Sequence, residues 1–234
     1  MSARSAAIDG DNPVGAANDG RVQRSARTRR LVVEAFLDLL GEGELHPTAQ
    51  QVAASSGVSM RSIFRLFEDV DALHVAAIAA QLDRVAHLIR PPRSEGTLSQ
   101  RISALVNRRA ELFEAIAPIR RFAVRLAPTS PPIRADQERA NNYLRAQVAE
   151  LFDAELGDLP ASRRSDVLDA LDVMTSFEVW DRMRVSQQLT ARAARRIVAG
   201  AVTSLLDGAN PRSAGRLDSD SPIPLQPGGI GGVR

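Results

Sequence analysis

Two arginines one helical turn apart are the side chains of this sequence best spaced to hold an anionic partner. Arg61 and Arg65 would share one side of a helix within residues 59–67, because successive residues of a helix turn by about 100°. Ile63 and Phe67 would then lie on the opposite, apolar side. Like charges at this spacing destabilise an isolated helix by roughly 0.2–0.5 kcal/mol, and arginine can read guanine through two hydrogen bonds. The pattern predicts a helix that contacts nucleic acid; the alternative is a solvated surface with two ordinary exposed arginines.

The residues before this segment predict a second short helix and a tight turn. Thr48 is a suitable N-cap, and Gln51 can complete a capping box with it. Gly57 lies where the chain must reverse, and glycine tolerates the positive φ that such a turn often needs. Ser59 can cap the next helix. Residues 48–67 therefore have the layout of a helix-turn-helix.

A basic helix precedes this pair. Its predicted range is 25–40, with an apolar stripe made of Leu31, Ala35, Phe36, Leu39 and Leu40. Five arginines with no acid among them lie at its start: Arg21, Arg24, Arg27, Arg29 and Arg30. Such a cluster attracts phosphates by simple electrostatics. The alternative is a solvated basic tail.

Taken together, these features resemble the tetracycline-repressor (TetR) family of bacterial transcription regulators. The resemblance covers residues 25–75 and is carried by the basic first helix, Val52 with Ala53, the Gly57-Val58-Ser59 turn, Phe64 with Phe67, and Asp71 with Leu73 at the start of a fourth helix. It implies an all-α protein with an N-terminal three-helix helix-turn-helix domain. It also implies a C-terminal helical domain that binds a small molecule and pairs two chains into a homodimer.

The expected partner is a double-stranded DNA operator of palindromic sequence. The predicted DNA-binding residues are Arg27, Arg30, Thr48, Ser59, Met60, Arg61, Ser62, Phe64 and Arg65. The family resemblance implies a repressor that an unknown small-molecule effector releases from DNA. The family usually has Tyr where Phe64 stands and Lys where Val70 stands. These two departures favour an alternative, a helical ligand-binding or interaction module whose specific DNA binding is weakened or lost.

Composition excludes several other classes of protein. The chain has 234 residues, 44% of them apolar, and no cysteine, which excludes disulfides and thiolate metal sites. His74 and His87 would project about 220° apart on one helix and so could not share a metal ion. No catalytic motif, cofactor motif, secretory signal or bilayer-length apolar run is present. We therefore expect a cytoplasmic protein that is not an enzyme, has no cofactor and has no membrane partner.

The expected organisation has four parts. They are a disordered leader at 1–22, the DNA-binding domain at 23–68, a ligand-binding and dimerisation domain at 69–208, and a flexible tail at 209–234. Within the third part, periodicity predicts helices at 69–89, 98–117, 120–126, 134–156, 161–183 and 190–206, separated by prolines and glycines. The last two helices could pair with a second copy, or could pack within one chain. Residues expected in a ligand pocket, or else in the plain core, are Phe113, Phe122, Tyr143, Phe152, Phe177 and Trp180.

Overall fold

The computed structural model describes residues 13–92 and 95–209, with side chains described from residue 21 onward. All regular secondary structure in this part of the chain is helical. The all-α fold predicted from the sequence is thus confirmed. The elements are α1 (Pro13–Gly41), α2 (Ala49–Ser56), α3 (Met60–Leu66), α4 (Val70–Arg84), α5 (Ala86–Ile89), α6 (Leu98–Leu126), α7 (Pro131–Leu151), α8 (Asp153–Gly157), α9 (Ala161–Met174), α10 (Phe177–Asp181), the π-helical η1 (Arg182–Ser186) and α11 (Ala191–Ala209). None of the helices among these residues is both long and apolar enough to cross a membrane.

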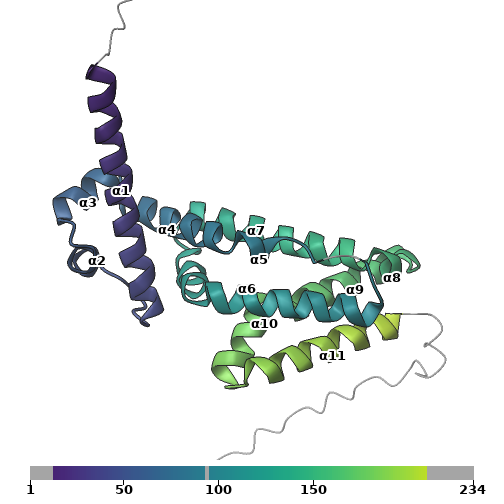
Figure 1. Cartoon of the computed structure of the whole chain (residues 1–234). Coiled ribbons are helices and arrows are strands. Elements are labelled where there is room, and N and C mark those ends of the chain that lie inside the picture. The colour runs from purple at the N-terminus through teal and green to yellow at the C-terminus, as the bar shows by residue number, and fades with distance from the viewer. Residues whose placement is uncertain (1–12, 93–94, 210–234) are drawn as a thin grey trace, which may run out of the picture.

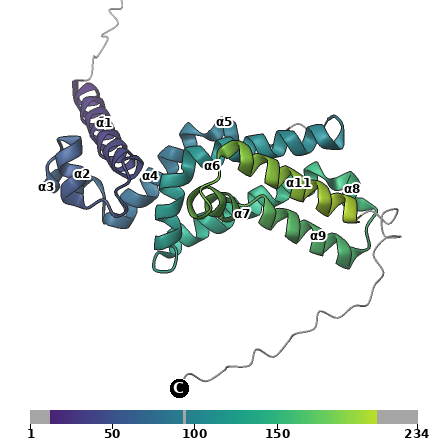
Figure 2. The ribbon, with the colours of Figure 1, turned by 90° about the horizontal axis from the view of Figure 1, so that it is seen from below.

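Helices α1, α2 and α3 lie together at one end of the molecule, and α4 leads from them into the rest (Figures 1 and 2). Their shared core is built from aliphatic and aromatic side chains of all four helices, including Val32, Phe36, Val52, Ile63, Phe67 and Leu73. Leu31, which was predicted on the buried stripe of α1, is exposed instead. The buried face is centred on Val32 and Phe36, because that side of α1 meets α2 and α4.

A second core fills the larger part of the molecule. Helices α6, α7, α9, α10 and α11 surround it, and α11 packs along both α6 and α9. The side chains that lie deepest in it include Leu105, Phe113, Val148, Phe152, Leu171 and Val202.

Helix α6 belongs to both cores. Its first half contributes Leu105 and Phe113 to the second core, whereas Ile119 and Phe122 near its end pack into the core of the N-terminal helices. The ring of Phe122 meets Phe36 edge-on at a centroid distance of 5.2 Å. This one helix therefore joins the two halves of the protein through buried apolar contacts.

Two predicted boundaries near the chain ends are wrong. Residues 13–22, predicted as part of a disordered leader, form the first turns of α1, which begins at Pro13 rather than near residue 25. Proline suits the first position of a helix because its missing N–H would have no helical partner there. Helix α11 also runs on to Ala209, three residues beyond its predicted end. Residues 1–12 of the predicted leader and 210–234 of the predicted tail lie outside the described residues.

Pro118 and Pro131 do not end helices in the way the sequence predicted. Pro118 lies inside α6, which runs without interruption where two helices, 98–117 and 120–126, were predicted. An interior proline costs about 3 kcal/mol, and burying several large side chains on both sides of it offsets that cost. Pro131 begins α7 instead of separating it from the preceding residues.

The predicted helices at 134–156 and 161–183 are each divided. The first becomes α7 and α8, and the second becomes α9, α10 and η1. The break between α9 and α10 lies at Thr175 and Ser176. The Thr175 hydroxyl donates to the Leu171 carbonyl near the end of α9, and the Ser176 hydroxyl caps α10 by accepting from the Val179 N–H. Short side-chain hydroxyls compete in this way with helical hydrogen bonding.

His74 lies buried against the rings of Phe36 and Phe122, with centroid distances of 5.4 and 4.8 Å. Its Nδ1 lies 3.6 Å from Asp71 Oδ1, too far for a hydrogen bond, and has no hydrogen-bond partner within the described residues. Burial lowers the pKa of His74 below its ordinary value of 6.5, although Asp71 acts in the opposite direction.

We expect acid to destabilise the fold through this side chain. The contribution of neutral His74 to the free energy of unfolding is fully present above the unfolded pKa of 6.5, and it is lost as the pH falls through the lowered folded pKa. It is lost because the unfolded chain binds a proton in this range more readily than the folded chain does. The free energy of unfolding from urea titrations at about pH 7.5 and about pH 5 should therefore fall more for the natural protein than for His74→Phe. An equal fall in both proteins would contradict this assignment.

Candidate nucleic-acid interface and the cavity behind it

The turn between α2 and α3 is built as the sequence predicted. The Thr48 hydroxyl accepts a hydrogen bond from the Gln51 N–H at 3.2 Å, and the Gln51 side chain accepts one from the Thr48 N–H at 2.8 Å, which completes the capping box. Gly57 has φ 68°, in the left-handed region that glycine adopts without strain. Ser59 caps α3 by accepting from the Ser62 N–H at 3.3 Å. These local contacts fix the direction in which α3 leaves the turn.

Helix α3 presents two different faces. Ile63 is buried in the N-terminal core, and so is Phe67, which caps the helix end. On the other side Arg61 and Arg65 are exposed, and neither makes a hydrogen bond or an ion pair with the described residues. Apolar packing behind the helix thus holds two unpaired guanidinium groups toward solvent.

The other predicted contact residues share this surface or flank it. Met60 and Phe64 on α3 are exposed, and Phe64 shows 54% of its area to solvent. The capping residues Thr48 and Ser59 are exposed, whereas Ser62 is half-buried and hydrogen-bonded to Ser59. Arg27 and Arg30 are exposed on α1.

The arginine cluster of α1 divides into two kinds of residue. Arg29 Nη1 donates to the Leu66 carbonyl at 2.8 Å, and its guanidinium lies 4.3 Å from the centroid of the Phe67 ring. Arg29 therefore holds the C-terminal end of α3 against α1. Arg27 and Arg30 have no such partner among the described residues, so they are the ones available to a phosphate.

A cavity of about 920 Å³ lies in the second half of the protein, between α6, α7, α9, α10 and η1. Its apolar wall includes Phe113, Ile116, Leu144 and Phe177, and the rings of Phe113 and Phe177 meet edge-on at 5.7 Å. Its polar lining is dominated by arginine: Arg109, Arg120, Arg121, Arg125 and Arg182. The acids that line it are Asp172, Glu178 and Asp181.

Two of the six predicted pocket residues, Phe113 and Phe177, line this cavity. The other four lie elsewhere. Phe122 packs in the N-terminal core and Phe152 in the second core, while Tyr143 is 47% exposed on α7. Trp180 is buried and donates its indole N–H to Glu114 at 3.0 Å. Helical periodicity marks such residues as buried, but it does not say which space they face.

Sequence reasoning missed the arginines of the cavity. The signal was present on α6, since Arg109, Phe113, Ile116 and Arg120 fall within about 60° of one another at 100° per residue. Two arginines on the same stripe as apolar side chains of the interior indicate a polar site facing the interior.

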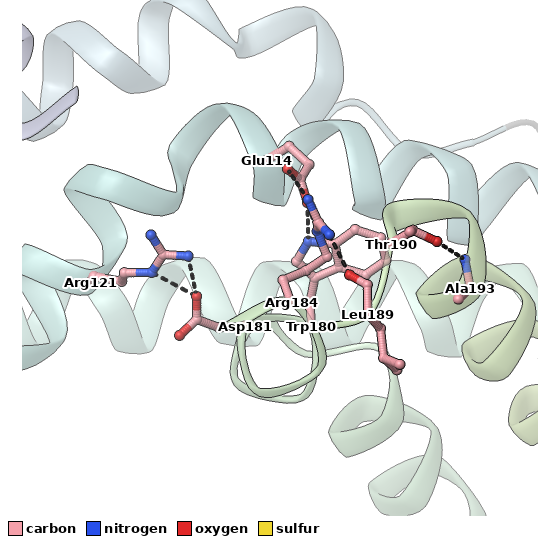
Figure 3. A network of polar contacts seen from close by, with 8 residues as sticks. All are labelled: Glu114, Arg121, Trp180, Asp181, Arg184, Leu189, Thr190 and Ala193. Carbon is pink, nitrogen blue, oxygen red and sulfur yellow. Dashed lines mark hydrogen bonds and ion pairs between the residues drawn. The ribbon is translucent and has the colours of Figure 1, made fainter. Parts of the chain in front are cut away.

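Two ion pairs fix α10 and η1 against α6, and Figure 3 shows both. Arg121 pairs with Asp181 at 2.7 Å, and Glu114 accepts from Arg184 Nε at 2.7 Å as well as from Trp180. The hydrogen bond from Arg184 lowers the pKa of Glu114 below its usual value. Arg182 and Ser186, at the two ends of η1, line the cavity. A π-helical turn at the wall of a cavity is a frequent feature of functional sites.

The cavity and the N-terminal helices are joined by named contacts. Arg125 lines the cavity and donates to the Leu45 carbonyl, in the α1–α2 connection, at 2.8 Å. A smaller hollow of about 70 Å³ between α4, α6 and α7 shares Ile116, Arg120 and Ala140 with the large cavity. A group that enters the cavity would therefore press on residues that also face α4.

No protein-family model matches the chain, and no curated protein matches it. Among solved structures, a transcriptional regulator from Rhodococcus sp. Rha1 has a similar fold. The TM-score is 0.60 at 14% sequence identity, over 79% of this chain and 97% of that chain. The helical architecture described above is therefore one that a transcriptional regulator also has.

We expect neighbouring arginines of α1 to behave differently on substitution. Arg29→Ala removes a hydrogen bond and a cation–π contact, so it should lower the free energy of unfolding by about 1 kcal/mol. Arg30→Ala removes no contact among the described residues and should change it by less than about 0.5 kcal/mol. Urea unfolding of the two matched variants measures both values. Equal losses would show that Arg29 does not hold α3.

Proposed function

We propose that the chain is a DNA-binding transcription regulator of the TetR type, a homodimer that binds a palindromic operator and is released from it by a small-molecule effector. The observation that carries the proposal is the pair Arg61 and Arg65, which are exposed, and without an ion pair to any described residue, on a helix whose other face is buried. The fold shared with the Rhodococcus regulator supports the same class of function.

In this proposal α3 enters the major groove. Arg61 and Arg65 read base edges or adjacent phosphates, and Met60 and Phe64 offer apolar contact of the kind that recognises a thymine methyl group. Thr48, Ser59 and Ser62 contact phosphates or base edges, and Arg27 and Arg30 contact the phosphate backbone. Phe64 has no hydroxyl to give a phosphate, so the two arginines of α3 supply the charge that fixes the helix on DNA.

Dimerisation would use the outer side of α11 together with α9. Val198, Val202 and Leu206 of α11 face its own chain, whereas Ile197 and Gly200 are exposed on the opposite side. Paired with a second copy, α9 and α11 would form a four-helix bundle that buries more than about 1,200 Å². Two copies of α3 about 34 Å apart would match one turn of DNA.

Release would begin in the cavity. An effector that contacts Arg120 and Arg125 would stabilise one position of α6, and α6 carries Ile119 and Phe122 into the N-terminal core. A shift of α6 relative to α4 would change the separation between the two copies of α3 in the dimer. An effector acts in this way only if it binds the two positions with different affinity.

A second candidate function is a helical ligand-binding module that no longer reads DNA. The exposed Phe64, which has no group to donate to a phosphate, favours it. Binding that falls steeply with salt and depends on DNA sequence supports the regulator, whereas binding without sequence preference supports the module.

We expect Arg61→Ala with Arg65→Ala to abolish specific DNA binding. Two lost base contacts of about 1–3 kcal/mol each correspond to a loss of at least tenfold in affinity. The assay is a gel shift on the promoter region beside the protein's own gene, at stated salt. Helicity by circular dichroism and mass in solution should not change, and undiminished operator affinity would refute the assignment.

We expect Ile197→Asp to convert the dimer into a monomer, because it places an unpaired charge in the centre of the proposed interface. Sedimentation velocity on the full chain measures the mass. Leu31→Asp is the matched control, since Leu31 is also exposed but lies on α1. A dimer that persists in Ile197→Asp would exclude this face of α11 from the interface.

A further inference from the structure

The cavity carries an excess of positive charge. Five arginines and three carboxylates line it, which gives a formal charge of +2. Two of the carboxylates are already used, because Glu178 pairs with Arg120 at 3.1 Å and Asp181 pairs with Arg121 at 2.7 Å. Because these two carboxylates are paired with other arginines, neither of them forms an ion pair with the buried Arg109.

Arg109 is 5% exposed, yet its side chain makes one hydrogen bond with the described residues, from Nη2 to the Leu144 carbonyl at 2.7 Å. No carboxylate among those residues lies within 4.0 Å of its guanidinium. The nearby Asp172 forms its ion pair with Arg145 instead. Burial lowers the pKa of Arg109 to about 10, and Asp172 opposes this, so Arg109 still carries its charge at neutral pH. A buried cation that lacks an anion is costly unless another group supplies the charge.

Arg120 supplies a second unmet donor in the same cavity. Its side chain is only 10% exposed and its Nη2 is held by Glu178 and Asn141. Its Nε is buried and has no hydrogen-bond partner within the described residues. Arg109 and Arg120 lie on one stripe of α6, three helical turns apart, and Phe113 and Ile116 of the apolar wall lie between them.

The geometry points to an organic acid as the effector: a carboxylate held by Arg109, with an apolar aromatic or branched body along Phe113 and Ile116 that reaches toward Arg120. This assignment rests on the proposed function only in treating the bound acid as the effector. A planar guanidinium matches a carboxylate through two parallel hydrogen bonds. A volume of about 920 Å³ has room for a molecule of this kind. A cationic ligand would be repelled by the charge of Arg109.

The test uses the full chain without DNA and a panel of acids, each beside its primary amide: 2-naphthoate, indole-3-acetate and 4-methylpentanoate. Isothermal titration should show at least one acid binding at least tenfold more tightly than its amide, because the amide keeps the shape and loses the charge. Arg109→Met should lower the affinity for that acid at least tenfold. Arg108→Met is the matched control, since Arg108 is the preceding residue on α6 but does not line the cavity, and it should bind as the natural protein does.

Each other outcome overturns the proposal. Amides that bind as well as their acids, a panel in which no acid binds, or unchanged affinity in Arg109→Met would all exclude a carboxylate on Arg109. Tighter binding of 2-naphthyl phosphate than of 2-naphthoate would assign the cavity to phosphates. If Arg109→Met does not fold, the comparison of acids with amides on the natural protein still decides the question.

A second measurement separates this proposal from the regulator function. The acid that binds should weaken the DNA complex in a gel shift with the natural protein and not with Arg109→Met. If the protein binds an acid but does not bind the promoter, the regulator function is refuted and the acid site stands. If the protein binds DNA with sequence specificity but binds none of the acids, the acid site is refuted and the regulator function stands.

Discussion

The burial of one helix in two hydrophobic cores is the constraint on which the rest of the structure depends. Helix α6 places Leu105 and Phe113 in the second core and Ile119 and Phe122 in the core that supports α3. It stays helical through Pro118 because apolar contacts are made on both sides of that residue. A closely packed interior does not deform gradually, so a displacement of α6 in one core must be matched by repacking in the other. The cavity lies against this same helix, so a molecule bound there would be coupled through α6 to the core that supports α3.

Local signals predicted the N-terminal part well, and long-range packing limited the prediction elsewhere. The capping box of Thr48, the positive φ of Gly57 and the buried position of Ile63 each depend on residues only a few positions away, and all three are confirmed. The expectation at Pro118 was wrong because the contacts that carry the helix through it come from segments distant in sequence. Phe122 and Phe152 were correctly expected to be buried, but periodicity could not tell which core receives each of them. Arg109 was missed because arginine is seldom fully buried.

Arginine joins many of the helix ends in this chain, in which every one of the 30 basic residues is arginine. The pattern is repeated: Arg29 donates to the carbonyl of Leu66, Arg101 to that of Leu151, Arg108 to that of His87 and Arg164 to that of Leu156. Carbonyls near a helix terminus lack intrahelical donors, and a cation also complements the negative end of the helix dipole. Arginine can satisfy such a carbonyl with one N–H while keeping four for other partners. The same side chain therefore serves as a structural cross-link here, and in the proposed function it would also contact the ligand and the DNA.

The π-helical turn η1 sets how the wall of the cavity can change over evolution. Arg182 and Ser186 both line the cavity from this turn, whereas Arg184 reaches back to Glu114. A π-helical turn holds about one residue more than an α-helical turn, so losing a single residue here would restore ordinary winding and change which side chains of η1 line the cavity. Relatives of this protein that differ by one residue here would therefore present a different set of side chains to the cavity without any substitution. Length variation within five residues would thus alter the lining of the cavity on an otherwise constant scaffold.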